Sequence, residues 1–164
     1  MTTYIFEIDL TKEVGLPAYQ VYKADGNGYG INPSPYPIRT MPPRLMKNDT
    51  IAIEFKLPEI EGKPGIAINW EETHLYVRPI RNSTNKTSPF GHLDSDSVKN
   101  EWKHRLATYG TNGSWTQRKF TIDETDGYWA FTIIGVFVKN GTGFHTPFFV
   151  DPEAQVGSGV SSPR

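Results

Sequence analysis

Side chains that could bind a metal ion are scattered along this chain. The four histidines are His74, His92, His104 and His145, and no two of them stand at a metal-binding spacing from one another or from carboxylates. A zinc site would therefore have to be assembled by the fold from distant positions. We predict that the protein has no metal site.

Carboxylates occur in two clusters that could in principle do hydrolytic chemistry. Glu71 and Glu72 are adjacent, and Asp123, Glu124 and Asp126 form the second group. Two carboxyl groups held ~5–10 Å apart can cleave a glycosidic bond. The sequence does not set that distance, and exposed charges at the ends of strands are commonly solvated turns. A hydrolase is the weakest of our three functional hypotheses.

The usual motifs of enzymes and cofactor sites are missing. The sequence has no Gly-x-Ser-x-Gly nucleophile turn, no phosphate-binding glycine loop and no dinucleotide-binding glycine pattern. It also has no cysteine, which excludes a thiolate nucleophile and a thiolate zinc site. We therefore predict a non-enzymatic protein with no catalytic residues and no cofactor.

Aromatic residues in polar loops are the best candidates for binding a ligand. Tyr29, Tyr36 and Phe90 lie in loop segments that contain proline, where their rings could be reached from solvent. Exposed aromatic rings bracketed by Asn and Asp side chains are suited to carbohydrate, so a glycan is the predicted partner if these residues form a site. The alternative interpretation is that the rings pin their loops against the sheets.

Size and charge define the class of protein. With 164 residues, the chain is predicted to form one domain at 1–157, followed by a flexible tail at 158–164. The formal net charge is -1, so we expect neither nucleic acid nor an acidic membrane surface as a partner. The N-terminal residues lack the pattern of a signal segment, and no apolar run approaches the ~20 residues that a membrane span needs. The expected location is the cytoplasm.

Period-two patterns of apolar residues predict strands along most of the chain. Residues 51–57 alternate strictly, and 127–138 form a longer run that is apolar on both faces, which predicts a strand covered on both sides. Asn140-Gly141 then predicts a two-residue hairpin turn. The returning strand is expected to end at Asp151-Pro152, because proline donates no hydrogen bond.

One segment has helical spacing. Val98, Trp102 and Leu106 recur every four residues, Asp96 or Ser97 can cap the start, and Gly110 can end the helix. We predict a short helix near 97–109, inserted into seven or eight strands. The expected fold is all-β, an antiparallel β-sandwich of the Ig-like or jelly-roll-like kind with Greek-key connections.

Several blocks of the sequence, taken in order, resemble the AidA/PixA family of bacterial inclusion-body proteins. They are YIFEIDL, VYKADGNGYG, KNDTIAIEF, a strand led by Trp115, GYWAFTIIGVF and PFFVDPEAQV. The chain departs from that pattern in its proline loop at 32–43 and in the insert at 81–110. The resemblance implies a cytoplasmic protein that accumulates and assembles or forms inclusions. It supplies no enzymatic residues to carry over.

These observations give three functional hypotheses. The first is a non-enzymatic protein that self-associates as a homo-oligomer, since near-zero net charge weakens the repulsion between copies. The second is a carbohydrate-binding module or lectin that uses the loop aromatics. The third is the hydrolase described above.

Overall fold

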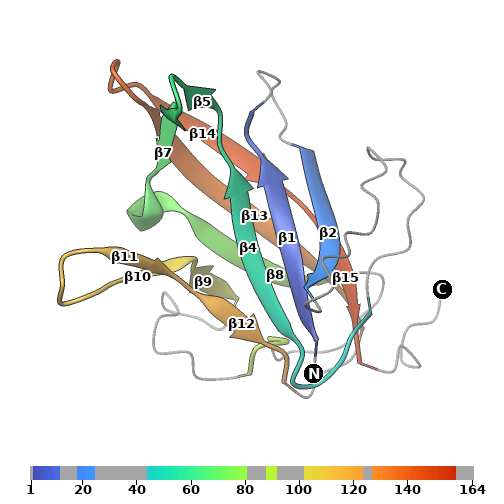
Figure 1. Ribbon diagram of the computed structural model, residues 1–164. Helices are drawn as coiled ribbons and strands as arrows, with labels where there is room; N and C mark the ends of the chain where they lie inside the picture. The colour runs from blue at the N-terminus through green and yellow to red at the C-terminus, as the bar shows by residue number, and fades with distance from the viewer. Residues whose placement is uncertain are drawn as a thin grey trace.

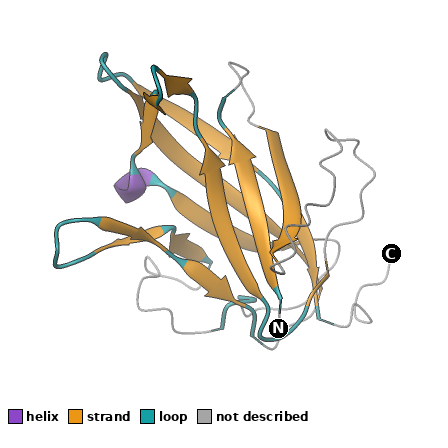
Figure 2. Cartoon of the chain, in the orientation of Figure 1, coloured by secondary structure: helices purple, strands orange, loops and turns teal. Residues whose placement is uncertain are grey.

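The protein is almost entirely β in the parts that its computed structural model describes, which are residues 2–11, 18–24, 44–80, 88–91, 102–123 and 127–157. Within these ranges the one helical segment is the short 3-10 turn η1 at Trp70–Glu72 (Figure 2). The predicted all-β class is confirmed. No helix within the same ranges is both long enough and apolar enough to cross a membrane.

The described residues form 15 strands. In chain order they are β1 Thr3–Asp9, β2 Ala18–Ala24, β3 Arg44–Leu45, β4 Thr50–Lys56, β5 Glu59–Ile60, β6 Lys63–Pro64, β7 Ile66–Ile68, β8 His74–Ile80, β9 Lys103–Arg105, β10 Ala107–Tyr109, β11 Trp115–Gln117, β12 Lys119–Thr121, β13 Gly127–Lys139, β14 His145–Val150 and β15 Glu153–Val156. The longest is β13, and it organises the larger of the two main sheets.

The smaller main sheet has four strands in the order β12-β4-β1-β2. Strand β1 pairs with β2 in antiparallel fashion and with β4 in parallel, so that Phe6 lies opposite Ile53. The alternation predicted for 51–57 directs Ile51 and Ile53 into the core. This sheet is amphipathic because its strands follow the period of two.

The larger sheet has seven strands built around β13. Strands β14 and β15 pair with one edge of β13, and β8 and β7 pair with the other edge (Figure 1). Strand β9 extends the sheet beyond β8, and β3 extends it beyond β15. Because β13 is 13 residues long, it pairs with two strands on each edge: β15 and β14 on one, β8 and β7 on the other.

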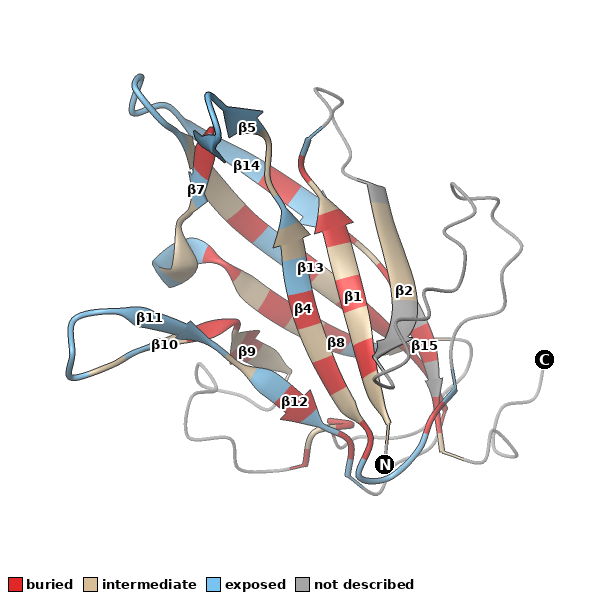
Figure 3. Cartoon of the chain, in the orientation of Figure 1, coloured by how far each residue is buried: buried red, intermediate tan, exposed pale blue. Residues whose placement is uncertain are grey.

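The hydrophobic core lies between the two main sheets. Phe6 of β1 meets Phe131 of β13 edge to face, with ring centroids 5.8 Å apart. Buried residues alternate with less buried ones along β1 and β4 (Figure 3). The large side chains with less than 2% exposure include Trp129, Phe6, Phe131, Ile8, Leu45, Ile51, Leu75, Leu106, Ile122 and Ile133. This burial of apolar area is the main stabilising term of the fold.

A long hairpin over residues 103–121 joins the two sheets on one side. Its outer part is the antiparallel pair β10–β11, while β9 pairs with β8 of the larger sheet and β12 pairs with β4 of the smaller one. The two arms separate at Arg118, whose backbone N–H donates to the carbonyl of Leu106 at 2.9 Å. The strands of this hairpin therefore extend both sheets on that side.

The predicted helix near 97–109 is wrong where the structure describes it. Residues 92–101 lie outside the described ranges, and 103–109 form β9 and β10. His104 and Leu106 are both buried, which is a period of two and not of four. Trp102 packs against Trp129 with the rings nearly parallel and 5.6 Å apart. A tertiary contact and pairing with β8 thus override the helical spacing.

The turn between β13 and β14 is longer than predicted. Lys139 pairs with Phe144 through a 3.0 Å backbone hydrogen bond, so the loop has four residues and not the two of Asn140-Gly141. Gly141 has the positive φ of 85° that the sequence led us to expect, but Asn140 has no positive φ. Instead, Asn140 donates from its side chain to the carbonyl of Pro64, which ties the loop to a neighbouring turn.

Strand β14 ends at Val150, directly before Asp151-Pro152, as predicted, but a further strand follows the dipeptide. Pairing with β13 continues in the same register on both sides of this dipeptide, as β14 before it and β15 after it. The carbonyl of Pro152 still accepts from the N–H of Phe131 at 2.7 Å. Proline removes only a donor, so it interrupts the strand without closing it. The predicted tail at 158–164 lies outside the described residues.

Strand β13 is not covered on both sides along its whole length, as we had predicted. Near its start, Tyr128 and Ala130 are buried together with Trp129 and Phe131. Further along, Ile133 is buried but Ile134 is 45% exposed. An apolar face of the larger sheet is therefore open to solvent, and it is the starting point for the functional site.

Candidate interaction surface

The outer face of the seven-stranded sheet, which points away from the smaller sheet, has a row of four side chains that the strand register places side by side. They are Arg105 of β9, His74 of β8, Ile134 of β13 and Phe149 of β14. Ile134 and Phe149 are 45% and 46% exposed. Side chains opposite one another on antiparallel strands have Cβ atoms about 5 Å apart, so these two form one apolar surface, here called the face patch.

A cationic margin, Lys103 and Arg105 of β9, borders this face. The ammonium group of Lys103 lies 5.5 Å from the centre of the Tyr76 ring. Within the described part of the chain, neither cation has an acidic partner. Partial burial, and then the charges of Lys103 and Arg105, lower the pKa of His74. His74 is therefore mainly neutral at pH 7, and the two β9 side chains provide the positive charge.

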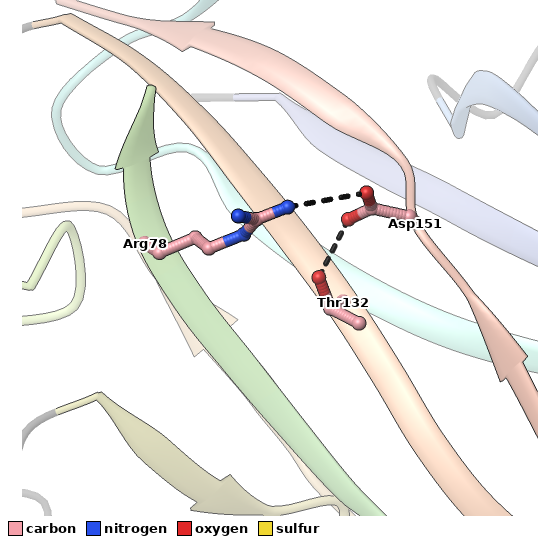
Figure 4. A network of polar contacts seen from close by, with 3 residues as sticks. All are labelled: Arg78, Thr132 and Asp151. Atoms are coloured by element: carbon pink, nitrogen blue, oxygen red, sulfur yellow. Dashed lines mark hydrogen bonds and ion pairs between the residues drawn. The ribbon is translucent and has the colours of Figure 1, made fainter. Parts of the chain in front are cut away.

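Among the described side chains of this face the acidic one is Asp151, and it is paired with neighbouring residues of the same molecule. Asp151 accepts a 2.5 Å hydrogen bond from the Thr132 hydroxyl and lies 3.6 Å from an Arg78 nitrogen (Figure 4). The Arg78 and Asp151 side chains are 64% and 36% exposed, so the ion pair itself adds little stability. The ion pair matters for the charge of this face. The Arg78 cation neutralises Asp151, so Asp151 does not neutralise Lys103 and Arg105.

The edge of β14 is a poor site for pairing with another strand. The hydrogen bonds of Phe131 to Pro152 and of Lys139 to Phe144 show which residues turn their backbone groups toward the partner strand: they are the odd-numbered ones in β13 and the even-numbered ones in β14. Pro147 therefore has its backbone nitrogen on the side away from β13. Proline cannot donate there, and proline on edge strands is a common protection against edge-to-edge pairing. The outer face is thus a better contact surface than this edge.

A second exposed aromatic group lies on the β10–β11 hairpin. Tyr109 and Trp115 pair across the two strands, with ring centroids 5.1 Å apart and 62% and 36% exposure. Between them Asn112 Oδ1 accepts from the backbone N–H and the hydroxyl of Ser114. Two exposed rings beside amide and hydroxyl groups are chemically suited to stacking on a sugar ring.

A buried serine and histidine lie close together but are not placed for catalysis. Ser88 Oγ and His104 Nε2 are 3.5 Å apart, and the two residues are 1% and 0% exposed. The His104 ring packs edge-on against both Phe90 and Phe120, which also contact each other. A substrate has no access to groups that are fully enclosed, so this pair belongs to the core.

The carboxylates considered for hydrolysis are exposed where the structure describes them. Glu71 and Glu72 are exposed on η1, and Asn69 donates to Glu72 at 3.0 Å. Asp123 is exposed after β12, while Glu124 and Asp126 lie outside the described residues. Among the residues that are described, no group of three or more His, Asp or Glu side chains could hold a metal ion.

The residues predicted to bind a ligand are not brought together in the described part of the structure. Tyr29 and Tyr36 lie outside it. Phe90 is half-buried, and its ring lies 5.0 Å from that of Phe120 and 5.9 Å from that of Phe131. Phe90 therefore pins its loop against the core, which is the alternative interpretation of the loop aromatics.

The sequence interpretation missed both exposed aromatic groups, although each had a signal. Tyr109 and Trp115 flank the Asn112-Gly113 turn, a hairpin pattern that the helix prediction obscured. Ile134 is one of the apolar residues on the second face of β13. The sequence analysis placed that face in the interior because it is apolar. The pattern of residues does not show whether another layer covers it.

Comparison of the chain with known protein families, with curated proteins and with solved structures gives no match. The resemblance to the AidA/PixA family therefore stays a prediction, and function has to be argued from the surfaces themselves.

Proposed function

We propose that this chain is a non-enzymatic β-sandwich protein, with Greek-key connections of the Ig-like or jelly-roll-like kind, that self-associates as an accumulation or interaction protein of the bacterial cytoplasm. The observation that carries the proposal is the open apolar face of β13, where Ile134 and Phe149 stand exposed beside one another. Contiguous exposed apolar surface on a sheet is typical of a protein contact.

Charge favours the same function. The formal net charge is only -1, so copies repel one another weakly when they approach. Pro147 disfavours open-ended pairing of β14 edges, which favours contacts between side chains on this side of the larger sheet. The resemblance to inclusion-body proteins points in the same direction.

Replacing Phe149 with Glu should abolish self-association without unfolding the protein. A carboxylate in the face patch would lose its hydration in the contact. Burying an unpaired charge costs on the order of several kcal/mol, and this cost opposes association. Because Phe149 is 46% exposed, the folded monomer can keep that charge in water. Sedimentation velocity of the variant should give a monomer at concentrations where the unmodified chain assembles.

The matched control is Tyr109→Glu, which places the same charge on an exposed aromatic position away from the face patch. This control should assemble like the unmodified chain. If Phe149→Glu assembles as well as the control does, the face patch is not the contact and the proposal in this form is wrong.

Glycan binding is the second candidate function, and the exposed pair of Tyr109 and Trp115 favours it. The two functions are separated by a glycan array probed with the unmodified chain and with Trp115→Ala. Retention of a glycan that is lost in Trp115→Ala supports a lectin, whereas no retention by either protein leaves self-association as the function.

A further inference from the structure

The β10–β11 hairpin and its base carry positive charge that the formal net charge of the chain conceals. Residues 102–121 contain four cations, Lys103, Arg105, Arg118 and Lys119, and no aspartate or glutamate. The whole chain has a formal net charge of -1, so the remaining residues carry -5, which is -1 minus +4. From the net charge alone we expected no acidic membrane as a partner, but a local excess of one sign can attract the opposite charge.

The aromatic pair lies at the outer end of this hairpin, which projects beyond the two main sheets (Figure 1). Tyr109 and Trp115 stand opposite one another and are 62% and 36% exposed. The Tyr109 ring lies along the turn, because a Cβ atom at Gly113 would be 3.6 Å from its hydroxyl oxygen. No residue from 106 to 117 is charged. The outer part of the hairpin is therefore aromatic and uncharged.

Cations stand on both arms at the base of the hairpin. The Arg118 backbone N–H donates to the Leu106 carbonyl at 2.9 Å, so the register of the outer part continues to the base. In that register Arg105 and Lys119 each stand four residues below the aromatic pair. Arg105 lies on the outer face of the larger sheet and Lys119 on the outer face of the smaller one. Among the described residues neither has an acidic partner, and the two are here called the cationic collar.

The turn at the end of the hairpin satisfies much of its own hydrogen bonding. The Gly110 N–H donates to the Ser114 carbonyl at 2.8 Å, and the Gly113 N–H donates to the Gly110 carbonyl at 3.0 Å. Asn112 Oδ1 accepts from the backbone N–H and the hydroxyl of Ser114. Polar groups that leave water without a partner cost free energy. A turn with these internal bonds can therefore enter a less polar layer at a lower cost.

We propose that this hairpin binds the surface of an anionic lipid membrane, with its aromatic end in the headgroup layer. Trp and Tyr rings favour the membrane–water interface because each combines an apolar body with a polar group. The collar stands about 13 Å behind them along an extended strand, which is close to one Debye length. Cations at that depth attract anionic headgroups on both sides of the hairpin. This interaction is separate from the proposed self-association through the face patch.

Single-stranded nucleic acid is the other polyanion that exposed rings and cations can bind. Its phosphates lie close to the bases that stack on aromatic side chains, so the cations of such a site line the same groove as the rings. In this hairpin the uncharged residues separate the rings from the collar. A layered surface, with an apolar zone below a charged one, matches that separation better than a strand does.

Cosedimentation with lipid vesicles tests the proposal. The unmodified chain should bind vesicles made of equal parts of phosphatidylcholine and phosphatidylglycerol about tenfold or more tightly than vesicles of phosphatidylcholine alone. Arg105→Gln with Lys119→Gln should remove about tenfold or more of that affinity, since each cation near an anionic surface contributes about fivefold. Circular dichroism should show both variant and unmodified chain folded, with the same unfolding midpoint.

The matched control is Lys63→Gln with Lys139→Gln, which removes the same charge from exposed positions on other hairpins. This control should bind the mixed vesicles within about twofold of the unmodified chain. Equal losses in the collar variant and in the control would overturn the proposal, because net charge alone would then explain the binding. Equal binding of the unmodified chain to both kinds of vesicle would overturn it as well.

Quenching by brominated acyl chains shows which surface enters the membrane. Mixed vesicles with brominated lipids should quench part of the tryptophan fluorescence of the unmodified chain, and much less in Trp115→Phe. The other three tryptophans, Trp70, Trp102 and Trp129, lie outside the hairpin end. Equal quenching in both proteins would place another surface on the membrane and overturn the proposal. Tighter binding of an oligothymidine strand than of the mixed vesicles would assign the hairpin to nucleic acid instead.

Discussion

Trp129→Ala is expected to lower the free energy of unfolding by about 3–5 kcal/mol, the range found when a large aromatic residue is removed from a core. Trp129 is completely buried and stacks on Trp102 at a centroid distance of 5.6 Å. Its removal opens a cavity between β13 and the Trp102 turn that leads into β9. Chemical denaturation followed by circular dichroism measures the change.

Trp129→Phe should cost much less than Trp129→Ala. Among the described residues the indole N–H of Trp129 has no hydrogen-bond acceptor, and a buried donor without a partner costs roughly 1–3 kcal/mol. Phenylalanine removes that donor while keeping part of the ring volume. The control is Trp115→Ala on the exposed hairpin, which should change stability by less than about 1 kcal/mol. Equal losses for Trp129→Ala and Trp115→Ala would mean that Trp129 is not at the centre of the core.

Gly135→Ala should destabilise the protein by about 2–3 kcal/mol, which is large for the addition of one methyl group. A Cβ atom at this position would lie 2.6 Å from the Thr73 hydroxyl oxygen and 2.8 Å from the Phe148 ring. Neither neighbour can move freely, because Thr73 is buried and its hydroxyl donates to the Asn69 carbonyl at 2.6 Å, while Phe148 is itself a buried core residue. The same denaturation experiment measures the loss.

Gly141→Ala is the matched comparison for Gly135→Ala. Gly141 has a φ of 85° but no atom within 4 Å of the added Cβ, so the change costs backbone strain alone, about 1 kcal/mol. If Gly135→Ala lowered the free energy of unfolding no more than Gly141→Ala does, β13 would not pack as closely against Thr73 and Phe148 as described.

Strands were predictable here wherever one physical signal dominated. The alternation at 51–57 and the aromatic and β-branched run at 127–138 both correspond to strands, because a half-buried sheet demands a period of two. The strands at 103–109, where we predicted a helix near 97–109, were not predictable, because Trp102 and Leu106 fit a spacing of four and a period of two equally well. Only the contact of Trp102 with Trp129 and the pairing of β9 with β8 decide between them.

The candidate surface was only partly predictable, for a different reason. Apolar residues on both faces of β13 could be read from the sequence, but the exposure of Ile134 depends on whether another layer covers it. Phe149 becomes its neighbour through the register of β13 with β14, which is set by the four-residue loop at 140–143 and not by the two-residue turn that the sequence suggested. The cationic margin comes from β9, in a segment that was assigned to a helix.

Sedimentation velocity of the unmodified chain tests self-association most directly. The experiment covers roughly a hundredfold range of concentration at pH 6.4, which is the sequence pI, and at about pH 9, where added negative charge opposes association. We expect the weight-average mass to rise above 18.5 kDa with concentration at pH 6.4, and to rise less at the higher pH. A constant mass of 18.5 kDa throughout both series would contradict self-association and favour glycan binding.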